Sequence, residues 1–130
     1  MPIRRLPLLA LALLVVPVAA IAQEVPQRFR GTYAADDAPE ACTVQESDGR
    51  IAVEADSIQF FASACALRRP RIDRDGRLTA QTACVEEGQD GSDEPRGRIV
   101  MTLRGERLGV TLDRDPVRFY RRCERALPVR

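Results

Sequence analysis

Apolar and polar residues alternate along most of the chain, and this alternation restricts the possible folds more than any other feature. A period of two places successive apolar side chains on one face of a β-strand, whereas a helix needs a period near 3.6. The clearest examples are Ile51 with Val53, Ile99-Met101-Leu103 and Leu108-Val110-Leu112. No segment after residue 22 sustains a helical stripe, so we expect an all-β protein with half-buried strands.

Turn residues separate these apolar runs at short intervals. The sequence Asp73-Arg74-Asp75-Gly76 ends in the Asp-Gly pair typical of tight hairpins, because Gly adopts a positive φ without strain. Further turns are expected at residues 55–57, 104–106 and 113–116. Residues 34–49 and 86–96 are expected to form two longer loops, the second of them acidic.

The runs between these turns make a series of seven to eight short strands. The first is expected to carry Phe29, Gly31 and Tyr33 on one face, and the last starts with Val117 and Phe119. Another is expected to continue from Ile58 to Ala64 without a break. Short connections favour an antiparallel meander, and pairing the last strand with the first removes both exposed edges. The predicted fold is a small antiparallel meander β-barrel.

The N-terminal segment has the features of a secretory signal peptide. Arg4 and Arg5 precede an apolar run over residues 6–18, and Ala20-Ile21-Ala22 then provides small residues for cleavage before Gln23. The run is shorter than the roughly 20 apolar residues of a membrane-spanning helix. We therefore expect residues 1–22 to be removed, residues 23–130 to form a single domain without a stable membrane anchor, and the protein to be periplasmic or secreted.

The charge of that domain is close to zero. The chain has 20 Lys plus Arg and 19 Asp plus Glu, and removing Arg4 and Arg5 leaves 18 cations against 19 anions. This balance argues against a nucleic-acid partner, which would require a basic excess. All the cations are Arg and there is no His. Nucleophilic catalysis therefore lacks the usual base, and we expect a protein that is not an enzyme and uses no cofactor.

The four cysteines, Cys42, Cys65, Cys84 and Cys123, all lie in the predicted domain. An even number of Cys in a small exported domain indicates two disulfides. The long gaps between the Cys and the lack of His argue against a metal site. A turn centred between Arg74 and Asp75 would place Cys65 opposite Cys84, which favours that bond together with Cys42–Cys123. The main alternative pairs Cys42 with Cys65 and Cys84 with Cys123.

Two short segments resemble lipocalin motifs. Phe29-Arg30-Gly31-Thr32-Tyr33 is similar to the G-x-W signature of the first lipocalin strand, with Tyr in place of Trp, and Tyr120-Arg121-Arg122-Cys123 is similar to the terminal Arg motif. The resemblance implies that an aromatic ring and an Arg stack to close one barrel end. Together with the four Cys, the pattern also resembles small periplasmic four-Cys β-barrel proteins of proteobacteria, a resemblance that implies no particular activity.

The parity of the last strand assigns the stacking role to Arg121. Val117, Phe119 and Arg121 share a face, and this face turns inward if the first and last strands close the barrel. Arg121 would then stack on Tyr33, which offsets the cost of burying a charge. The alternative is that the strand ends earlier and that both Arg121 and Arg122 are solvated. Gly31, Tyr33, Arg121 and the four Cys are thus the expected structural residues.

Clustered arginines are the candidate binding residues. One hairpin carries Arg68, Arg69, Arg71, Arg74 and Arg77, and the end of the chain carries Arg118, Arg122 and Arg125. The candidates among them are Arg68, Arg69, Arg71, Arg118 and Arg122. Guanidinium groups bind carboxylates and phosphates through paired hydrogen bonds. The alternative role for these side chains is to form salt bridges with the many Asp and Glu of the chain.

Phe61 is the candidate apolar anchor. Neighbouring residues on a strand point to opposite faces, so only one of Phe60 and Phe61 can face the core. Phe61 would then either contact a partner or be covered by the 34–49 loop. The predicted function is a non-enzymatic binding or interaction protein of the periplasm, such as an inhibitor or envelope accessory factor, whose partner is a periplasmic protein or an anionic small ligand. A lipocalin-like small-ligand carrier is the second hypothesis and an enzyme the third.

Overall fold

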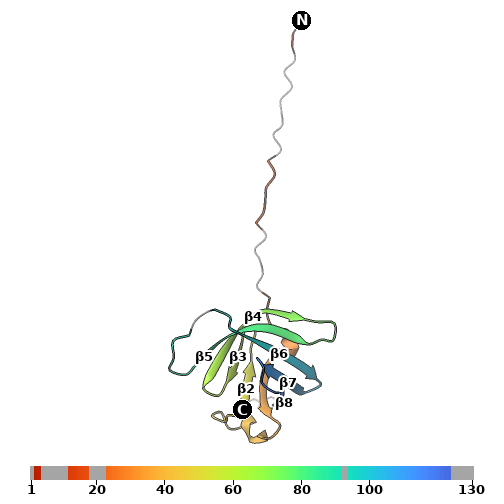
Figure 1. The fold of residues 1–130 in the computed structure, drawn as a ribbon. Coiled ribbons are helices and arrows are strands. Elements are labelled where there is room, and N and C mark those ends of the chain that lie inside the picture. The colour runs from red at the N-terminus through yellow and green to blue at the C-terminus, as the bar shows by residue number, and fades with distance from the viewer. Residues whose placement is uncertain (1, 4–11, 18–22, 92–93, 124–130) are drawn as a thin grey trace, which may run out of the picture.

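The computed structural model of the chain is a closed barrel of eight antiparallel strands (Figure 1). It describes residues 2–3, 12–17, 23–91 and 94–123. Each strand pairs with its neighbours in sequence, and β1 pairs with β8 to close the barrel. The strands are β1 (Gly31–Ala35), β2 (Arg50–Val53), β3 (Ser57–Phe60), β4 (Ser63–Ile72), β5 (Leu78–Glu86), β6 (Gly97–Arg104), β7 (Arg107–Leu112) and β8 (Arg118–Arg122). The predicted all-β fold, the meander and the barrel are confirmed.

Several strand boundaries differ from the sequence-based prediction. Ala34 and Ala35, predicted to lie in a loop, belong to β1, and Val117, predicted to start the last strand, precedes β8. Phe29 lies in a short 3-10 helix, η1 (Gln27–Phe29), so the first strand begins only at Gly31. The run from Ile58 to Ala64 is divided between β3 and β4 by a tight turn at Phe61 and Ala62. Ala62 has a φ of 60° in this turn. Because neither turn residue is Gly, Asn or Asp, the sequence lacks the usual signal for a hairpin here.

Side chains from all eight strands fill the barrel interior. The largest fully buried ones include Tyr33, Ile51, Ile58 and Met101, each at most 2 % exposed. Burying one such side chain contributes about 1.5–3 kcal/mol relative to leaving it in water. The interior is therefore a packed hydrophobic core.

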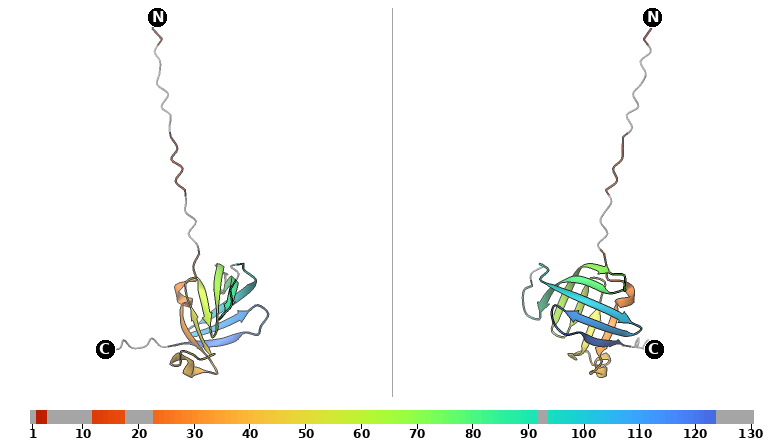
Figure 2. Two further views of the ribbon diagram at one scale, coloured as in Figure 1. Left: turned by 90° about the vertical axis from the view of Figure 1, so that its left-hand side faces the viewer. Right: turned by 45° about the vertical axis from the view of Figure 1, so that its right-hand side comes forward.

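The segment before β1 closes one end of the barrel. Val25 and Phe29 are fully buried in the core, and the Val25 N–H donates to Ala55 O at 2.8 Å in the β2–β3 turn. The Arg28 guanidinium contacts the carbonyl of Gly76 in the β4–β5 turn at 3.5 Å. Figure 2 shows this segment alongside the barrel. We call this end, where η1 meets the hairpin turns, the closed end.

The long β1–β2 connection folds back over the outside of β1. It contains a second 3-10 helix, η2 (Pro39–Cys42), and leaves the outward-facing Ala34 only 3 % exposed. Arg50 Nη1 donates to the carbonyls of Ala41 and Cys42 at 3.2 and 3.1 Å. The predicted Cys42–Cys123 disulfide is present and joins this connection to the end of β8.

The Cys65–Cys84 disulfide is also present, but the register that allows it differs from the predicted one. Ile72 faces Leu78, so the β4–β5 turn is centred on Asp75. That register alone would place Cys65 opposite Val85. A β-bulge between Arg68 and Arg71 shifts the pairing by one residue and brings Cys65 opposite Cys84. Both disulfides follow the favoured connectivity.

The N-terminal segment is described only in part. The predicted signal peptide, residues 1–22, lies largely outside the described residues, as do residues 124–130 at the C-terminus. In the parts of the chain that the structure describes, no helix has the length and apolar character needed to cross a membrane.

Candidate binding surface

The β-bulge of β4 gathers three arginines on the outer face of the barrel. In a regular strand Arg68 and Arg69 would point to opposite faces. Here Arg69 adopts a φ of 50°, and both Arg68 and Arg69 are exposed while the following Pro70 is buried. Arg71 is exposed as well. A positive φ costs a non-Gly residue roughly 1–2 kcal/mol, so the backbone is strained at Arg69, in the middle of this group of arginines.

Arg98 on β6 extends this group across the sheet. Arg68 pairs with Gln81 on β5, and Gln81 pairs in turn with Arg98, so the three side chains form one row on the outer face. Strands in a sheet lie about 4.8 Å apart, which places the backbones of Arg68 and Arg98 about 10 Å apart. We define the arginine face as Arg68, Arg69, Arg71 and Arg98.

Arg98 is not among the binding residues predicted from the sequence. It stands alone in the sequence, between Gly97 and Ile99, and has no basic neighbour to draw attention to it. Its position on the outer face was predictable from the period of two, because Ile99 and Met101 face inward. The strand register, which the sequence did not provide, was needed to place it beside Arg68.

Charge is unevenly distributed between strands and loops. Strands β4 to β8 carry three Arg on β4, two on β6, one on β7 and three on β8, whereas Glu86 at the end of β5 is their single acid. The other acids near these strands lie in turns and loops. Within the described residues, none of the four arginines of the arginine face forms an ion pair. The face is therefore basic although the predicted domain is close to neutral.

Arg122, not Arg121, closes the barrel end against Tyr33. The β8 register turns Tyr120 and Arg122 inward, and the Arg122 guanidinium lies 4.9 Å from the centre of the Tyr33 ring. Arg122 Nη1 and Nη2 donate to the carbonyls of Arg30 and Arg28 at 2.7 and 2.6 Å. Its Nε contacts Glu106 Oε2 at 3.1 Å. The predicted stack exists, but it was assigned to the wrong arginine.

The error in β8 arises from the direction of Phe119. Its ring points outward and is covered by the Arg107 guanidinium at 4.0 Å, so an aromatic that looked like a core residue lies on the surface. Arg121 lies on the same outer face and is exposed. Arg122, predicted as a binding residue, is thus a structural residue. Gly31 contributes because a Cβ there would lie 2.9 Å from Arg122 Nη1.

The other predicted binding residues lie apart from the arginine face. Arg118 is at the start of β8, where its Nη2 lies 3.9 Å from Asp37 Oδ1 and its guanidinium 5.5 Å from the Tyr120 ring centre. Phe61 is in the β3–β4 turn and is 54 % exposed, so the 36–49 connection does not cover it. These two residues do not form one site with Arg68, Arg69 and Arg71.

Both tyrosines of the chain have altered acidity. Burial raises the pKa of Tyr33 above its ordinary value of 10.0, and the nearby Arg122 charge opposes this change. Burial likewise raises the pKa of Tyr120, opposed by Arg118. The Tyr33 hydroxyl donates to Phe29 O at 2.8 Å inside the closed end. Both phenols are therefore neutral structural groups at physiological pH.

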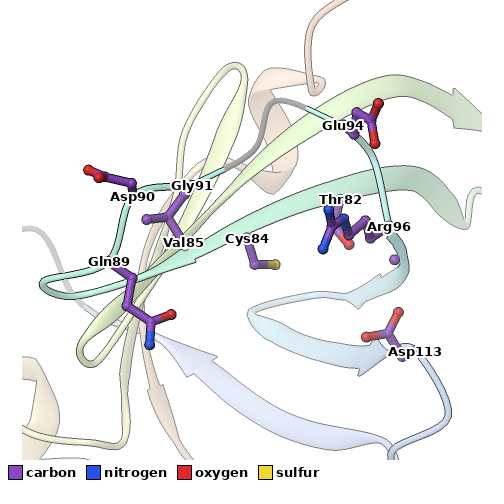
Figure 3. A pocket seen from close by; sticks show the side chains of 10 residues that line it. Thr82, Cys84, Val85, Gln89, Asp90, Gly91, Glu94, Arg96 and Asp113 are labelled. Carbon is purple, nitrogen blue, oxygen red and sulfur yellow. The ribbon is translucent and has the colours of Figure 1, made fainter.

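A polar cavity of about 300 Å³ lies beside β5 and the β5–β6 loop (Figure 3). Its walls carry the carboxylates of Asp90, Glu94 and Asp113 and the guanidinium of Arg96. Asp113 Oδ1 accepts a hydrogen bond from the Arg98 N–H at 2.9 Å and so holds the β7–β8 turn against β6. The cavity has an acidic lining, in contrast to the arginine face.

The described residues offer little for metal binding or for nucleophilic catalysis. Among them, no three His, Cys, Asp or Glu side chains are grouped closely enough to hold a metal ion. All four Cys are in disulfides, and the sequence has neither His nor Lys. Comparisons with models of protein families, with curated proteins and with solved structures found no match.

Proposed function

We propose that this chain is an exported, non-enzymatic binding protein that holds an acidic segment of a partner protein on its arginine face. The observation that carries the proposal is the bulge at Arg69 and Pro70, which directs Arg68, Arg69 and Arg71 to one side of the barrel. Strained backbone that presents exposed charged groups is a recurrent feature of functional sites. Because these guanidinium groups form no ion pair within the described residues, they are available for carboxylates.

The spread of the arginines favours an extended partner over a single small anion. The backbones of Arg68 and Arg98 lie about 10 Å apart across two strand spacings, so the four guanidinium groups offer positions for more than one carboxylate. An acidic peptide segment can place successive carboxylates at this spacing. Complementary charge of this kind increases the rate of association and selects between partners more than it increases affinity.

The periplasm is the compartment that we propose. The two disulfides are compatible with an exported protein, because such bonds persist in oxidising environments. Signal-peptide features in residues 1–22 supply the remaining support. N-terminal sequencing of the periplasmic form should read from Gln23, and a sequence that begins at Met1 would contradict the proposed export.

The two alternative functions have weaker support. A lipocalin-like carrier needs an internal cavity, whereas the barrel interior contains packed side chains such as Tyr33, Ile58 and Met101. Native mass spectrometry of the purified protein would reveal a bound small molecule if the carrier hypothesis were correct. Catalysis would require a base other than His or Lys.

Charge reversal of the arginine face tests the binding proposal. We would immobilise residues 23–130 as wild type, as the double variant Arg68→Glu/Arg98→Glu and as Arg74→Glu, and expose each to periplasmic extract. Arg74 is the matched control because it is exposed in the β4–β5 turn and lacks an ion pair among the described residues. Proteins captured by the wild type and by Arg74→Glu should be missing from the double variant.

A defined probe complements this capture. A fluorescent oligo-glutamate peptide should bind the wild type and the Arg74→Glu variant with similar affinity, and its affinity should fall as salt is added. The double variant should bind at least tenfold more weakly. Equal capture and equal peptide affinity for all three proteins would refute the proposed role of the arginine face.

A further inference from the structure

A second surface site lies on the outer face of β6, β7 and β8, apart from the arginine face. It is a groove of about 340 Å³ that we call the Gly109 groove, and it is lined by Thr102, Arg104, Arg107, Gly109, Val117 and Phe119. Arg104 and Arg98 both lie on β6 and are six residues apart, which corresponds to about 20 Å along a strand. The groove and the arginine face are therefore two separate surfaces.

A glycine at position 109 lets the side chains that line the groove pack closely at its base. Gly109 pairs with Thr102 on one side and with Phe119 on the other. Gly109 is buried, and a Cβ at this position would lie 2.8 Å from Thr102 Oγ1 and 3.2 Å from Phe119 Cε1, so any other residue would push these two side chains apart. Val117 and Phe119 remain 49 % and 38 % exposed and form an apolar wall.

Two arginines lie at the end of the groove next to the β6–β7 turn. Arg104 and Arg107 face each other across this turn. The Arg107 guanidinium is held in place, because its Nε and Nη2 donate to Asp36 Oδ2 at 3.1 and 2.9 Å and it lies 4.0 Å from the Phe119 ring centre. Arg104 is exposed and has no ion pair within the described residues.

We propose that the Gly109 groove binds small apolar carboxylates, such as medium-chain fatty acids. The carboxylate pairs with the unneutralised Arg104 guanidinium, whose planar fork matches two carboxylate oxygens. The apolar body lies against the exposed parts of Phe119 and Val117. Asp36 already balances the charge of Arg107, so the groove has one net positive charge for one anionic group.

The dimensions of the groove fit a small molecule. Its volume of about 340 Å³ is near the lower end of the roughly 300–1,000 Å³ typical of small-molecule sites. The wall is fixed before binding, because Asp36, Arg107 and Phe119 hold one another in place. A site that is already ordered loses little conformational entropy when the ligand binds.

Decanoate is the probe for this proposal. Titration into the ¹⁵N-labelled domain, below the concentration at which decanoate forms micelles, should shift the backbone amide signals of Gly109 and Phe119 in a saturable manner. Decanol, which has the same chain length but no charge, should bind at least tenfold more weakly. Shifts confined to residues outside the groove, or no saturable shift, would overturn the proposal.

Two substitutions separate the charge of the groove from its apolar wall. Arg104→Gln removes the anion partner and should weaken decanoate binding at least tenfold. Val117→Asp places a negative charge on the wall and should also prevent binding. Val117 lies outside the strands, so this substitution leaves the strand pairing intact. Arg74→Gln is the control for the loss of one exposed arginine and should bind decanoate as the wild type does.

All three variants should remain folded, so a loss of decanoate binding can be assigned to the groove itself. Arg104, Val117 and Arg74 are all exposed, so each variant should melt within a few degrees of the wild type. Unchanged decanoate affinity in Arg104→Gln would refute the assigned role of this arginine. Peptide binding to the arginine face is a separate measurement, so either proposal can fail while the other holds.

Discussion

Replacing Arg122 by Ala should destabilise the barrel far more than replacing its neighbour Arg121 by Ala. Arg122 joins β8 to the segment before β1 through two hydrogen bonds to backbone carbonyls, an ion pair with Glu106 and a stack on Tyr33. Arg121 is exposed and has no ion pair in the part of the chain that the structure describes. The two variants remove the same charge from adjacent positions, so their difference isolates the contacts at the closed end.

The contacts of Arg122 give the size of the effect. Hydrogen bonds from a charged group contribute about 1.5–3 kcal/mol each, and values near the lower limit apply because one of the two carbonyl contacts is exposed. Stacking on Tyr33 adds about 0.5–2 kcal/mol, and an exposed ion pair about 0–1 kcal/mol. Since neighbouring contacts are not additive, we expect a total loss of about 2–4 kcal/mol.

Urea unfolding and thermal melting followed by circular dichroism would measure this loss. For a domain of about 100 residues, 1 kcal/mol shifts the Tm by about 4–8 °C, so Arg122→Ala should lower the Tm by about 8 °C or more. Arg121→Ala should change the free energy of unfolding by less than about 0.5 kcal/mol. Arg122→Lys keeps the charge but cannot reach both carbonyls, and its Tm should lie in between. Equal melting of the two Ala variants would refute the reasoning.

Three further predictions follow from other parts of the barrel. Burial raises the pKa of both tyrosines, so phenolate absorbance should appear above pH 10.0 in the folded protein and near pH 10.0 in denaturant. Because the phenols of the unfolded chain lose their protons first, the free energy of unfolding should fall as the pH rises through the pKa of the folded phenols. Coincident titrations would contradict this. Replacing both Cys of the Cys42–Cys123 bond by Ser should lower the free energy of unfolding by about 4.5 kcal/mol, and the same change at Cys65–Cys84 should lower it by about 3.3 kcal/mol. The first bond has the larger effect because it closes a loop of 81 residues and the second a loop of 19. Urea unfolding that shows the reverse order would exclude the loop-entropy explanation. Arg69→Gly should raise the free energy of unfolding by up to about 1 kcal/mol, because Gly adopts the φ of 50° without strain, and a lower midpoint in urea would show that Arg69 is not strained.

Much of the fold could be predicted from the sequence because a period of two and turn residues act locally. The hairpin after Ile72 and the paired strands β6 and β7 have both signals. The turn at Phe61 and Ala62 has neither, because tertiary pairing imposes a positive φ on an alanine there. Local rules do not detect a turn that is specified by strand pairing elsewhere in the barrel.

The Cys65–Cys84 disulfide was predicted correctly, but from a strand register that differs from the one in the structure. Cys65 and Cys84 were paired from a turn assumed to be centred between Arg74 and Asp75. The turn is centred on Asp75, and the bulge after Arg68 shifts the pairing by one residue so that Cys65 still faces Cys84. Pro70 lacks the backbone N–H that strand pairing needs, so it is a sequence signal for a bulge that the prediction of the strands did not use.

The candidate site could be predicted only in part for the same reason. Three arginines adjacent in the sequence were selected, whereas Arg98 required knowledge of strand pairing. Arg122 was assigned to binding and Arg121 to the stack, because Phe119 was expected to face inward. The wrong predicted direction of Phe119 therefore exchanged the predicted roles of Arg121 and Arg122.

Each strand pairs with the next one along the chain, and this order has a consequence for how the barrel folds. Hairpins such as β4–β5 and β6–β7 can form early, because closing short loops costs little entropy. Pairing of β1 with β8 joins opposite ends of the domain, so we expect it to form late in folding. The Cys42–Cys123 bond lies at this seam. Oxidation of that pair would therefore keep the two ends of the domain close together even when the strands unpair, until a reductant breaks the bond.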